Sequence, residues 1–310
     1  MSKVSNRVAI CDALIQQAEK DPKIVALVSD SRGSASLTPF AKAYPERLIE
    51  VGIAEQNLVG MAGGMASCGM KPYVASPASF LTMRAIEQIK VDVCYSKTNV
   101  KLIGISAGIS YGALGMSHHS LQDIAVLSTI PNMRIFVPAD HYEATKIMEK
   151  LIQDELPAYI RVGRNPVEEV HENAGFDFEI GKGMELHPGN DLTIMAIGEM
   201  VKPALDAARE LESAGLGIRV LNFPTIKPLD EEIIIKAARE TKGIITMEEH
   251  STINGFGSMV ARVVSEHAPC RVKVLGLPDE SLITGESPEL FHYYGLDAEG
   301  LKEAVRQFPG

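Results

Sequence analysis

The stretch Glu50-Val51-Gly52-Ile53-Ala54-Glu55-Gln56-Asn57 decides the fold prediction, because the sequence pattern changes there from strand to helix. Residues 47–53 alternate and include β-branched side chains, which is typical of a strand. From Ala54 onward the chain is rich in Ala, Met, Leu and Gly and has no proline until Pro72, which favours a helix. Glu55 is therefore expected in the first helical turn after a strand. In a parallel α/β sheet this position is the carboxyl edge, where ligand sites collect.

Glu55 has two interpretations. Acidic residues are common at helix starts, because they offset the positive end of the helix dipole. The surroundings of Glu55 indicate a second role, since its flanks are apolar and Gly60, Gly63 and Gly64 follow in the same helix. Each interior glycine costs about 1 kcal/mol relative to alanine, so three of them indicate the close approach of another helix or chain. A carboxyl group enclosed in such a place is either paired or protonated.

Three motifs together resemble a known family. They are residues 51–56, the small-residue helix that ends at Cys68-Gly69-Met70-Lys71-Pro72, and Ser79-Phe80-Leu81. In this order and spacing they are similar to the pyrimidine-binding domain of transketolases and deoxyxylulose-phosphate synthases, which are thiamine diphosphate (TPP) enzymes. The resemblance covers the first half of the chain well and continues in the family's style to the C-terminus.

Composition sets the broad class. The chain has 310 residues, of which 45% are hydrophobic, and this length suggests about two domains. A net charge of −10 argues against nucleic acid or an anionic membrane as the main partner. The four cysteines show no CxxC pairing, which suits a reducing cytoplasm and predicts no metal site. No signal segment and no membrane-spanning apolar run is found, so we expect no membrane partner.

Strand and helix patterns alternate along the chain, which predicts an α/β fold of two doubly wound domains with mostly parallel sheets. The resemblance implies a pyrimidine-binding domain over residues 1–164 and a transketolase C-terminal-like domain over residues 191–310. Residues 165–190 break the alternation and contain Pro166, Pro188 and few periodic apolar positions. We expect a linker there, with a loop or short hairpin.

The resemblance implies that Glu55 is catalytic and binds the cofactor. TPP chemistry requires a deprotonated thiazolium carbon. A carboxylic acid bonded to the aminopyrimidine ring favours the imino tautomer, whose nitrogen can take that proton. Glu55 would have to hold or share a proton near neutral pH, so desolvation must outweigh the effect of the helix start.

Two further residues match the cofactor pocket of the family. Phe80 would stack on the pyrimidine ring, although an aromatic residue at a helix start is more often part of the core. Asp30 follows a buried strand over residues 24–29 and corresponds to a segment that lines the pocket. An Asx turn or helix cap is the alternative for Asp30.

A second informative stretch is Gly115-Met116-Ser117-His118-His119-Ser120. The two histidines lack a third metal ligand, and solvated loop residues are the alternative. His118 matches the histidine of the family's Gly-Pro-Thr-His segment, which implies substrate binding and either donation to an oxyanion or proton relay. Leu114 and Ser106 stand where transketolases have an acidic residue and a histidine linked to sugar hydroxyls. The donor substrate is therefore left open.

Arginines flank Gly163 after the last strand of the first domain. Arginine suits bidentate phosphate binding, and Arg161 best matches the family's phosphate-contacting residue, so we assign it to the substrate; Arg164 stays unassigned. In the second domain, Glu248-Glu249-His250 and Gly255-Phe256-Gly257-Ser258 form a strand-to-helix turn that could hold an anion, but we expect it to be structural.

One family motif is missing. The family holds the TPP diphosphate through Mg²⁺ with a Gly-Asp-Gly motif and a downstream Asn, and this chain contains neither. Those residues belong to a domain that precedes the region matched here. The resemblance therefore implies that a partner chain, an N-terminal transketolase subunit, binds the metal and the diphosphate. We expect an α₂β₂ assembly in which the helix around residues 60–69 packs at the dimer core.

The leading hypothesis is the C-terminal subunit of a split transketolase, which transfers a two-carbon ketol unit between phosphorylated sugars. A subunit similar to deoxyxylulose-phosphate synthase or to the β chain of 2-oxo-acid dehydrogenases is the alternative, with pyruvate or another oxo acid as donor. Leu114 keeps that alternative open. A non-catalytic scaffold chain is the third hypothesis.

Overall fold

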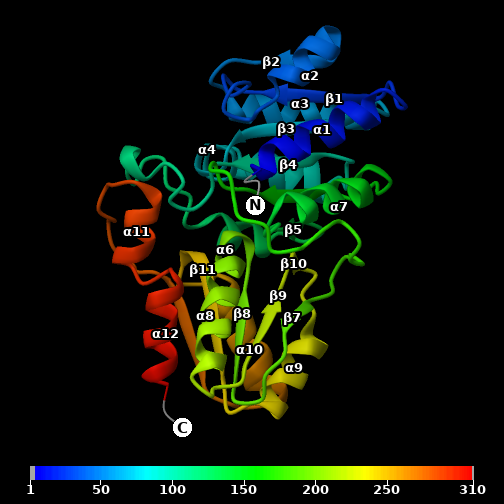
Figure 1. Ribbon diagram of the computed structural model, residues 1–310. Coiled ribbons are helices and arrows are strands. Elements are labelled where there is room, and N and C mark those ends of the chain that lie inside the picture. Colours follow the sequence, from blue (N-terminus) through cyan, green and yellow to red (C-terminus); the bar gives the residue numbers. More distant parts are fainter. Residues whose placement is uncertain (1–3, 309–310) are drawn as a thin grey trace.

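The computed structural model describes residues 4–308, which form two α/β domains, one above the other in Figure 1. A seven-stranded sheet lies at the centre of the first domain, in the order β10-β5-β6-β4-β3-β1-β2. Six of its strands run parallel to one another: β1 (Ile24–Val28), β2 (Leu48–Glu50), β3 (Lys71–Pro77), β4 (Lys101–Ile105), β5 (Arg134–Phe136) and β6 (Ala158–Arg161).

Helices cover both faces of this sheet, as the alternation predicts (Figure 1). One apolar cluster includes Leu58 and Val59, and the cluster on the other face includes Leu14 and Ile147. The helices of this domain are α1 (Asn6–Ala18), α2 (Thr38–Ala43), α3 (Glu55–Ser67), α4 (Ala78–Arg84), α5 (Ile86–Gln88), the π-helix Ile89–Tyr95, α6 (Asp123–Ser128) and α7 (His141–Ile152).

Two predicted elements differ in detail. The strand expected over residues 47–53 ends at Glu50, and Gly52 turns the chain with a φ of 71° before α3 begins. The left-handed backbone there suits glycine, which has no Cβ. The helix expected to start at Phe80 begins at Ala78 and is divided into α4, α5 and a π-helix. Glu55 is the first residue of α3, as predicted.

The second domain has a five-stranded sheet in the order β12-β11-β8-β9-β7. Its strands are β7 (Met184–His187), β8 (Leu192–Ala196), β9 (Ile218–Asn222), β11 (Ile244–Ser251) and β12 (Val272–Leu277). All pairs are parallel except β7 with β9. The helices are α8 (Val201–Ser213), α9 (Glu231–Glu240), α10 (Phe256–His267), α11 (Ser287–Tyr293) and α12 (Ala298–Arg306).

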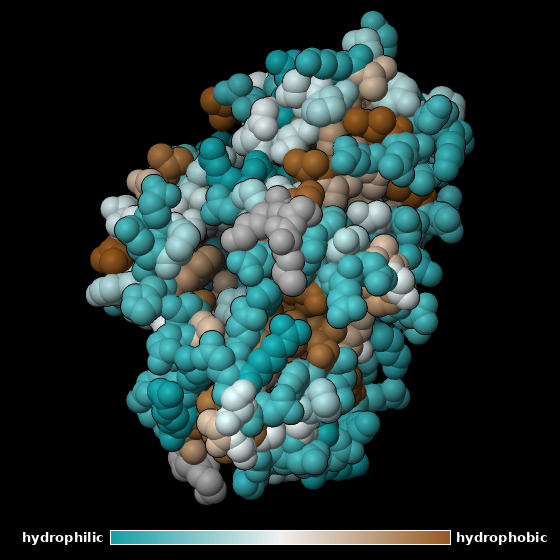
Figure 2. Space-filling model, in the orientation of Figure 1, coloured by the Kyte–Doolittle hydropathy of each residue, from teal (hydrophilic) through white to brown (hydrophobic). Residues whose placement is uncertain are grey.

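One strand from the second half of the chain joins the sheet of the first domain. β10 (Thr225–Lys227) follows β9 in the chain but pairs antiparallel with β5, at the edge of the first sheet. β7 lies inside the segment predicted as linker and belongs to the second sheet. The outer surface in Figure 2 is mostly hydrophilic, with apolar side chains in separate patches. Within residues 4–308, no helix combines the length and apolar character that crossing a membrane requires.

Candidate active site

Glu55 is a buried acid with a cationic partner. Its side chain is enclosed, with 1% of the residue surface exposed, although it begins a helix. Oε2 accepts a hydrogen bond from Nη1 of Arg84 at 2.7 Å. Oε1 lies 3.5 Å from Oγ of Ser29, which in turn is 2.8 Å from Oγ of Ser76. Because Ser29 follows β1 and Ser76 lies near the end of β3, the acid sits at the carboxyl edge of two adjacent strands.

A row of rings and cations continues from this acid. The guanidinium of Arg84 lies 4.9 Å from the ring centroid of Phe80. The ring of His118 meets the Phe80 ring edge-on, with 5.2 Å between the ring centroids. The Tyr111 ring also contacts His118, with 5.6 Å between their centroids. The guanidinium of Arg164 lies 4.9 Å from the Tyr111 ring. The structure therefore brings three predicted residues, Glu55, Phe80 and His118, into one connected site.

Asp30 lies at the same sheet edge but does not join this row. Its backbone N–H donates to Oε1 of Glu50 at 2.6 Å, and its φ of 53° is left-handed, as in a tight turn. The residue is exposed, and its carboxylate makes no hydrogen bond or ion pair within residues 4–308. A role for Asp30 in cofactor binding stays a prediction.

Arg161, which is predicted to bind the substrate phosphate, is enclosed in the protein, and its role toward the substrate stays a prediction. Arg161 is only 4% exposed, and its guanidinium is hydrogen-bonded to acceptors inside the protein. Nε lies 2.9 Å from Oδ2 of Asp123, and Nη2 donates to the carbonyls of Ser120 and Glu249 at 3.2 and 2.7 Å. Arg161 is enclosed because it is the last residue of strand β6, whereas Arg164 lies beyond the end of that strand. Arg164 borders an open cavity together with Ser110, Tyr111, Asn165 and Glu286.

The adjacent histidines face different surroundings. His118 is half-buried, and its Nδ1 lies 2.9 Å from Oγ of Ser117. His119 is buried and lines a cavity with Phe80, Met83 and Arg84. Burial lowers the pKa of His119, and the nearby backbone of Gly112 and Tyr111 offsets this only in part. The His119 ring is therefore neutral near neutral pH.

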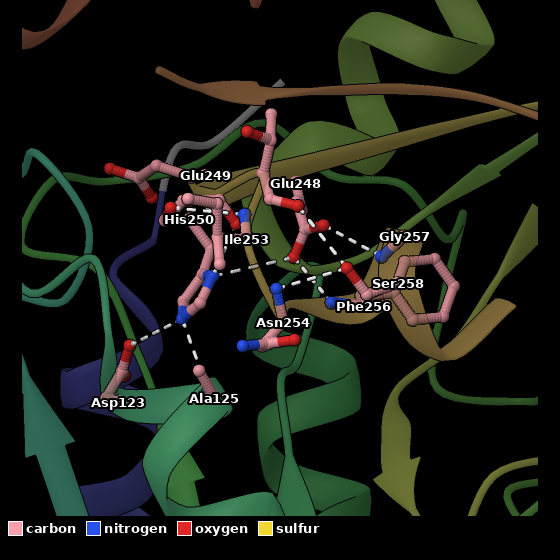
Figure 3. Close-up of polar contacts among 12 residues, drawn as sticks. Asp123, Ala125, Glu248, Glu249, His250, Ile253, Asn254, Phe256, Gly257 and Ser258 are labelled. Carbon is pink, nitrogen blue, oxygen red and sulfur yellow. Dashed lines mark hydrogen bonds and ion pairs between the residues drawn. The ribbon is translucent and has the colours of Figure 1, made fainter. Parts of the chain in front are cut away.

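The strand-to-helix turn of the second domain is occupied by the chain's own carboxylate, as Figure 3 shows. Glu248 accepts the N–H groups of Phe256 and Gly257 at 2.7 and 2.8 Å, at the start of α10. Burial raises the pKa of Glu248 to about 7 against the effect of these two bonds. His250 lies between Glu248 and Asp123, and burial lowers its pKa to about 4. The turn is structural, because its anion position is filled.

Two family models match the chain. The model for the transketolase pyrimidine-binding domain matches residues 2–169, and the model for the transketolase C-terminal domain matches residues 181–301. The chain belongs to the transketolase family. Its two α/β domains with mostly parallel sheets correspond to these two models, in the predicted order.

Relatives of similar length include single subunits of transketolases. An apulose-4-phosphate transketolase subunit of Phocaeicola vulgatus is 46% identical, with 98% of this chain and 97% of the relative covered. A solved split-gene transketolase, described as an inactive β4 tetramer, has a TM-score of 0.88 and 39% identity over 99% of this chain and 98% of that one. The 1-deoxy-D-xylulose-5-phosphate synthase of Heliobacterium modesticaldum is 38% identical over 96% of this chain, which spans 46% of that enzyme.

Sequence reasoning on this transketolase-family chain missed Arg84 and Tyr111. Arg84 follows Phe80 by four residues, so helical spacing alone places both side chains on one face of α4. Tyr111 had no such signal, because its contact with His118 depends on the path of an irregular loop. Among residues 4–308, no group of three or more His, Cys, Asp or Glu residues could hold a metal ion.

Proposed function

We propose that this chain is the pyrimidine-binding, C-terminal subunit of a split TPP-dependent transketolase that transfers a two-carbon ketol unit between phosphorylated sugars. The observation that carries the proposal is the enclosed carboxyl group of Glu55, which Arg84 links to the face of the Phe80 ring, with the ring of His118 at the edge of that ring. The family relationship supports the same conclusion.

The residues present fit the pyrimidine end of TPP. An acid shielded from water can bond a ring nitrogen, and an aromatic face can support a flat ring. When bound, TPP supplies a carbon nucleophile that accepts and releases the ketol unit. In this proposal Glu55 holds a proton against the pyrimidine ring, and Phe80 orients the ring by contact with its face. His118 donates to the substrate oxygen or moves a proton there.

Substrate phosphate requires a cation on the open side of the site. Arg164 meets this requirement better than Arg161, because Arg164 borders a cavity and Arg161 is buried in an ion pair. An arginine fork binds phosphate oxygens in a bidentate manner. Leu114 is exposed near the same loop and adds no charge for sugar hydroxyls. We therefore assign the substrate phosphate to Arg164.

The proposed assembly includes a partner subunit that supplies the metal site. Residues 4–308 form no metal cluster, so we propose that a partner N-terminal subunit holds Mg²⁺ and the diphosphate. An α₂β₂ assembly in the cytoplasm is part of the proposal. The solved relative that forms a β4 tetramer is described as inactive, which supports the need for the second kind of subunit. Gly64 of α3 has open space where a side chain would stand, which suits contact with another chain.

The rival donor is pyruvate, in a reaction like that of deoxyxylulose-phosphate synthase. The 38% identity to such an enzyme and the apolar Leu114 favour this alternative. Reconstitution with a candidate N-terminal subunit, TPP and Mg²⁺ tests both. Ketol transfer from a ketose phosphate supports the transketolase, and carbon dioxide release from pyruvate supports the rival. Activity with neither donor in a complex that binds TPP would favour the scaffold hypothesis.

A further inference from the structure

The loop that carries His118 is closed at its base. Gly108 and Ser120 exchange two backbone hydrogen bonds, of 3.1 and 2.8 Å, so residues 108–120 leave the first sheet and return to the same point. Tyr111 and His118 both belong to this loop, and their rings contact each other. The placement of the His118 ring therefore depends on what holds the base.

The second domain holds one end of this base. Oε1 of Glu249, at the end of β11, accepts the N–H of Ile109 at 2.7 Å. Oγ of Ser287, at the start of α11, donates to the carbonyl of Ile109 at 3.1 Å. Both polar groups of one loop residue are thus bonded to side chains more than a hundred residues away in the sequence.

The other end of the base is tied to the same strand. Arg161 donates through Nη2 to the carbonyls of both Ser120 and Glu249, and its Nε bonds Asp123 at the start of α6. These groups are all buried, where a lost hydrogen bond is expensive because water cannot replace it.

Glycines make this contact between domains possible. A Cβ on Gly108 would collide with the Glu249 carboxyl group, and the φ of Gly108 is +61°. A Cβ on Gly112 would collide with the backbone carbonyl of Gly285 in the second domain. Loop and second domain therefore fit together without space for any side chain at these two positions.

From this geometry we infer that Glu249 and Ser287 are positioning residues, through which the C-terminal domain holds the His118 loop in its working conformation. The inference rests on the proposed function in one respect, namely that His118 acts on the substrate. It assigns to the C-terminal domain, which lacks the residues of the site itself, a direct part in arranging that site.

Glu248 provides a matched control. It neighbours Glu249 on β11 and is equally buried, but its carboxylate points toward Phe256 and Gly257, while Glu249 points away from them (Figure 3). Glu248 therefore accepts hydrogen bonds from α10 of its own domain, and Glu249 accepts a hydrogen bond from the loop of the first domain.

Amide hydrogen exchange tests whether Glu249 holds the loop over residues 108–120. The experiment uses the whole chain and the reconstituted complex, and it does not require turnover. In Glu249→Ala, peptides covering residues 108–120 should exchange about ten- to a hundredfold faster, since the buried N–H of Ile109 loses its acceptor. Glu249→Gln keeps a carbonyl acceptor and should exchange close to the wild-type rate. Glu248→Ala should speed exchange at residues 256–257 and leave the loop unchanged.

Steady-state kinetics of the reconstituted enzyme tests the catalytic half. Glu249→Ala and Ser287→Ala should lower kcat for ketol transfer with little change in the affinity for TPP. Glu249→Gln, which keeps an acceptor, should have a kcat close to that of the wild type. Glu248→Ala should lower the unfolding temperature and keep the wild-type kcat per folded enzyme. The inference fails if Glu249→Ala leaves loop exchange or kcat unchanged, or if Glu248→Ala affects both as strongly. If loop exchange responds as expected but the wild-type complex transfers no ketol unit, the proposed function fails and the anchoring of the loop stands.

Discussion

The guanidinium of Arg84 and the buried carboxylate of Glu55 form an ion pair of 2.7 Å at the edge of the first sheet. The same guanidinium lies over the ring of Phe80. Arg84 thus contacts both groups that would receive the pyrimidine ring. The cation therefore holds one oxygen of the carboxyl group that would bond the ring nitrogen.

We expect Glu55→Gln to reduce ketol transfer by the reconstituted enzyme at least about a hundredfold, the size typical of a lost acid or base. The amide keeps the shape of the side chain but cannot exchange a proton with the ring. The measurement is kcat at saturating TPP and Mg²⁺. Glu46→Gln, an exposed residue just before β2, is the control and should behave as wild type. Wild-type turnover by Glu55→Gln would support the scaffold hypothesis instead.

Arg84→Met should tighten the binding of TPP to the assembled enzyme by about three- to tenfold, because a partly exposed ion pair no longer competes for Glu55. Calorimetry with TPP and Mg²⁺ measures this change. Inorganic pyrophosphate, which lacks the ring, should bind with unchanged affinity. Arg84→Lys keeps the positive charge and should stay near the wild-type value. Weaker TPP binding in Arg84→Met would mean that Arg84 holds the cofactor rather than competing with it.

The two arginines after Ile160 should respond differently to replacement by alanine. Arg164→Ala should raise the KM for the phosphorylated substrate and leave the free energy of unfolding nearly unchanged, since it borders a cavity. Arg161→Ala should lower the free energy of unfolding by about 3–5 kcal/mol, because it leaves the buried carboxylate of Asp123 without its cation. Denaturant unfolding and substrate titration separate these effects. A stable Arg161→Ala protein with a raised KM would favour Arg161 as the phosphate-binding residue.

Stability should depend on pH through Glu249. Burial raises the pKa of Glu249 to about 8, while the carboxyl group of an unfolded glutamate has its ordinary pKa of 4.5. Between these values the unfolded chain loses a proton that the folded chain keeps. The free energy of unfolding should therefore fall as pH rises from about 5 to 8, at up to about 1.4 kcal/mol per pH unit for this group.

Glu249→Gln removes this titration. The free energy of unfolding of the variant should therefore fall less steeply than that of the wild type as pH rises through the same range. Urea unfolding at several pH values measures the difference. Glu149→Gln, on an exposed part of α7, should follow the wild-type slope. Parallel slopes for wild type and Glu249→Gln would contradict the prediction.

Several features follow from short stretches of sequence. The alternation of strands and helices, the position of Glu55 at the start of α3 and the cap of α7 by Asp140 depend on neighbouring residues only, so local patterns are sufficient to predict them. The same holds for the order of the motifs around Phe80 and His118, on which the resemblance rests. The strands β7 and β10 lie outside this group, because short strands carry a weak pattern.

Only the tertiary structure decides which side chains meet. The pairing of Arg84 with Glu55 joins the helices that follow β3 and β2, which lie on either side of β1, and the bond from Ile109 to Glu249 joins residues 140 apart in the sequence. The choice between Arg161 and Arg164 likewise depends on which one the second domain buries. Periodicity reports the face on which a residue lies, whereas contacts between elements depend on packing of the whole chain, which no local stretch contains.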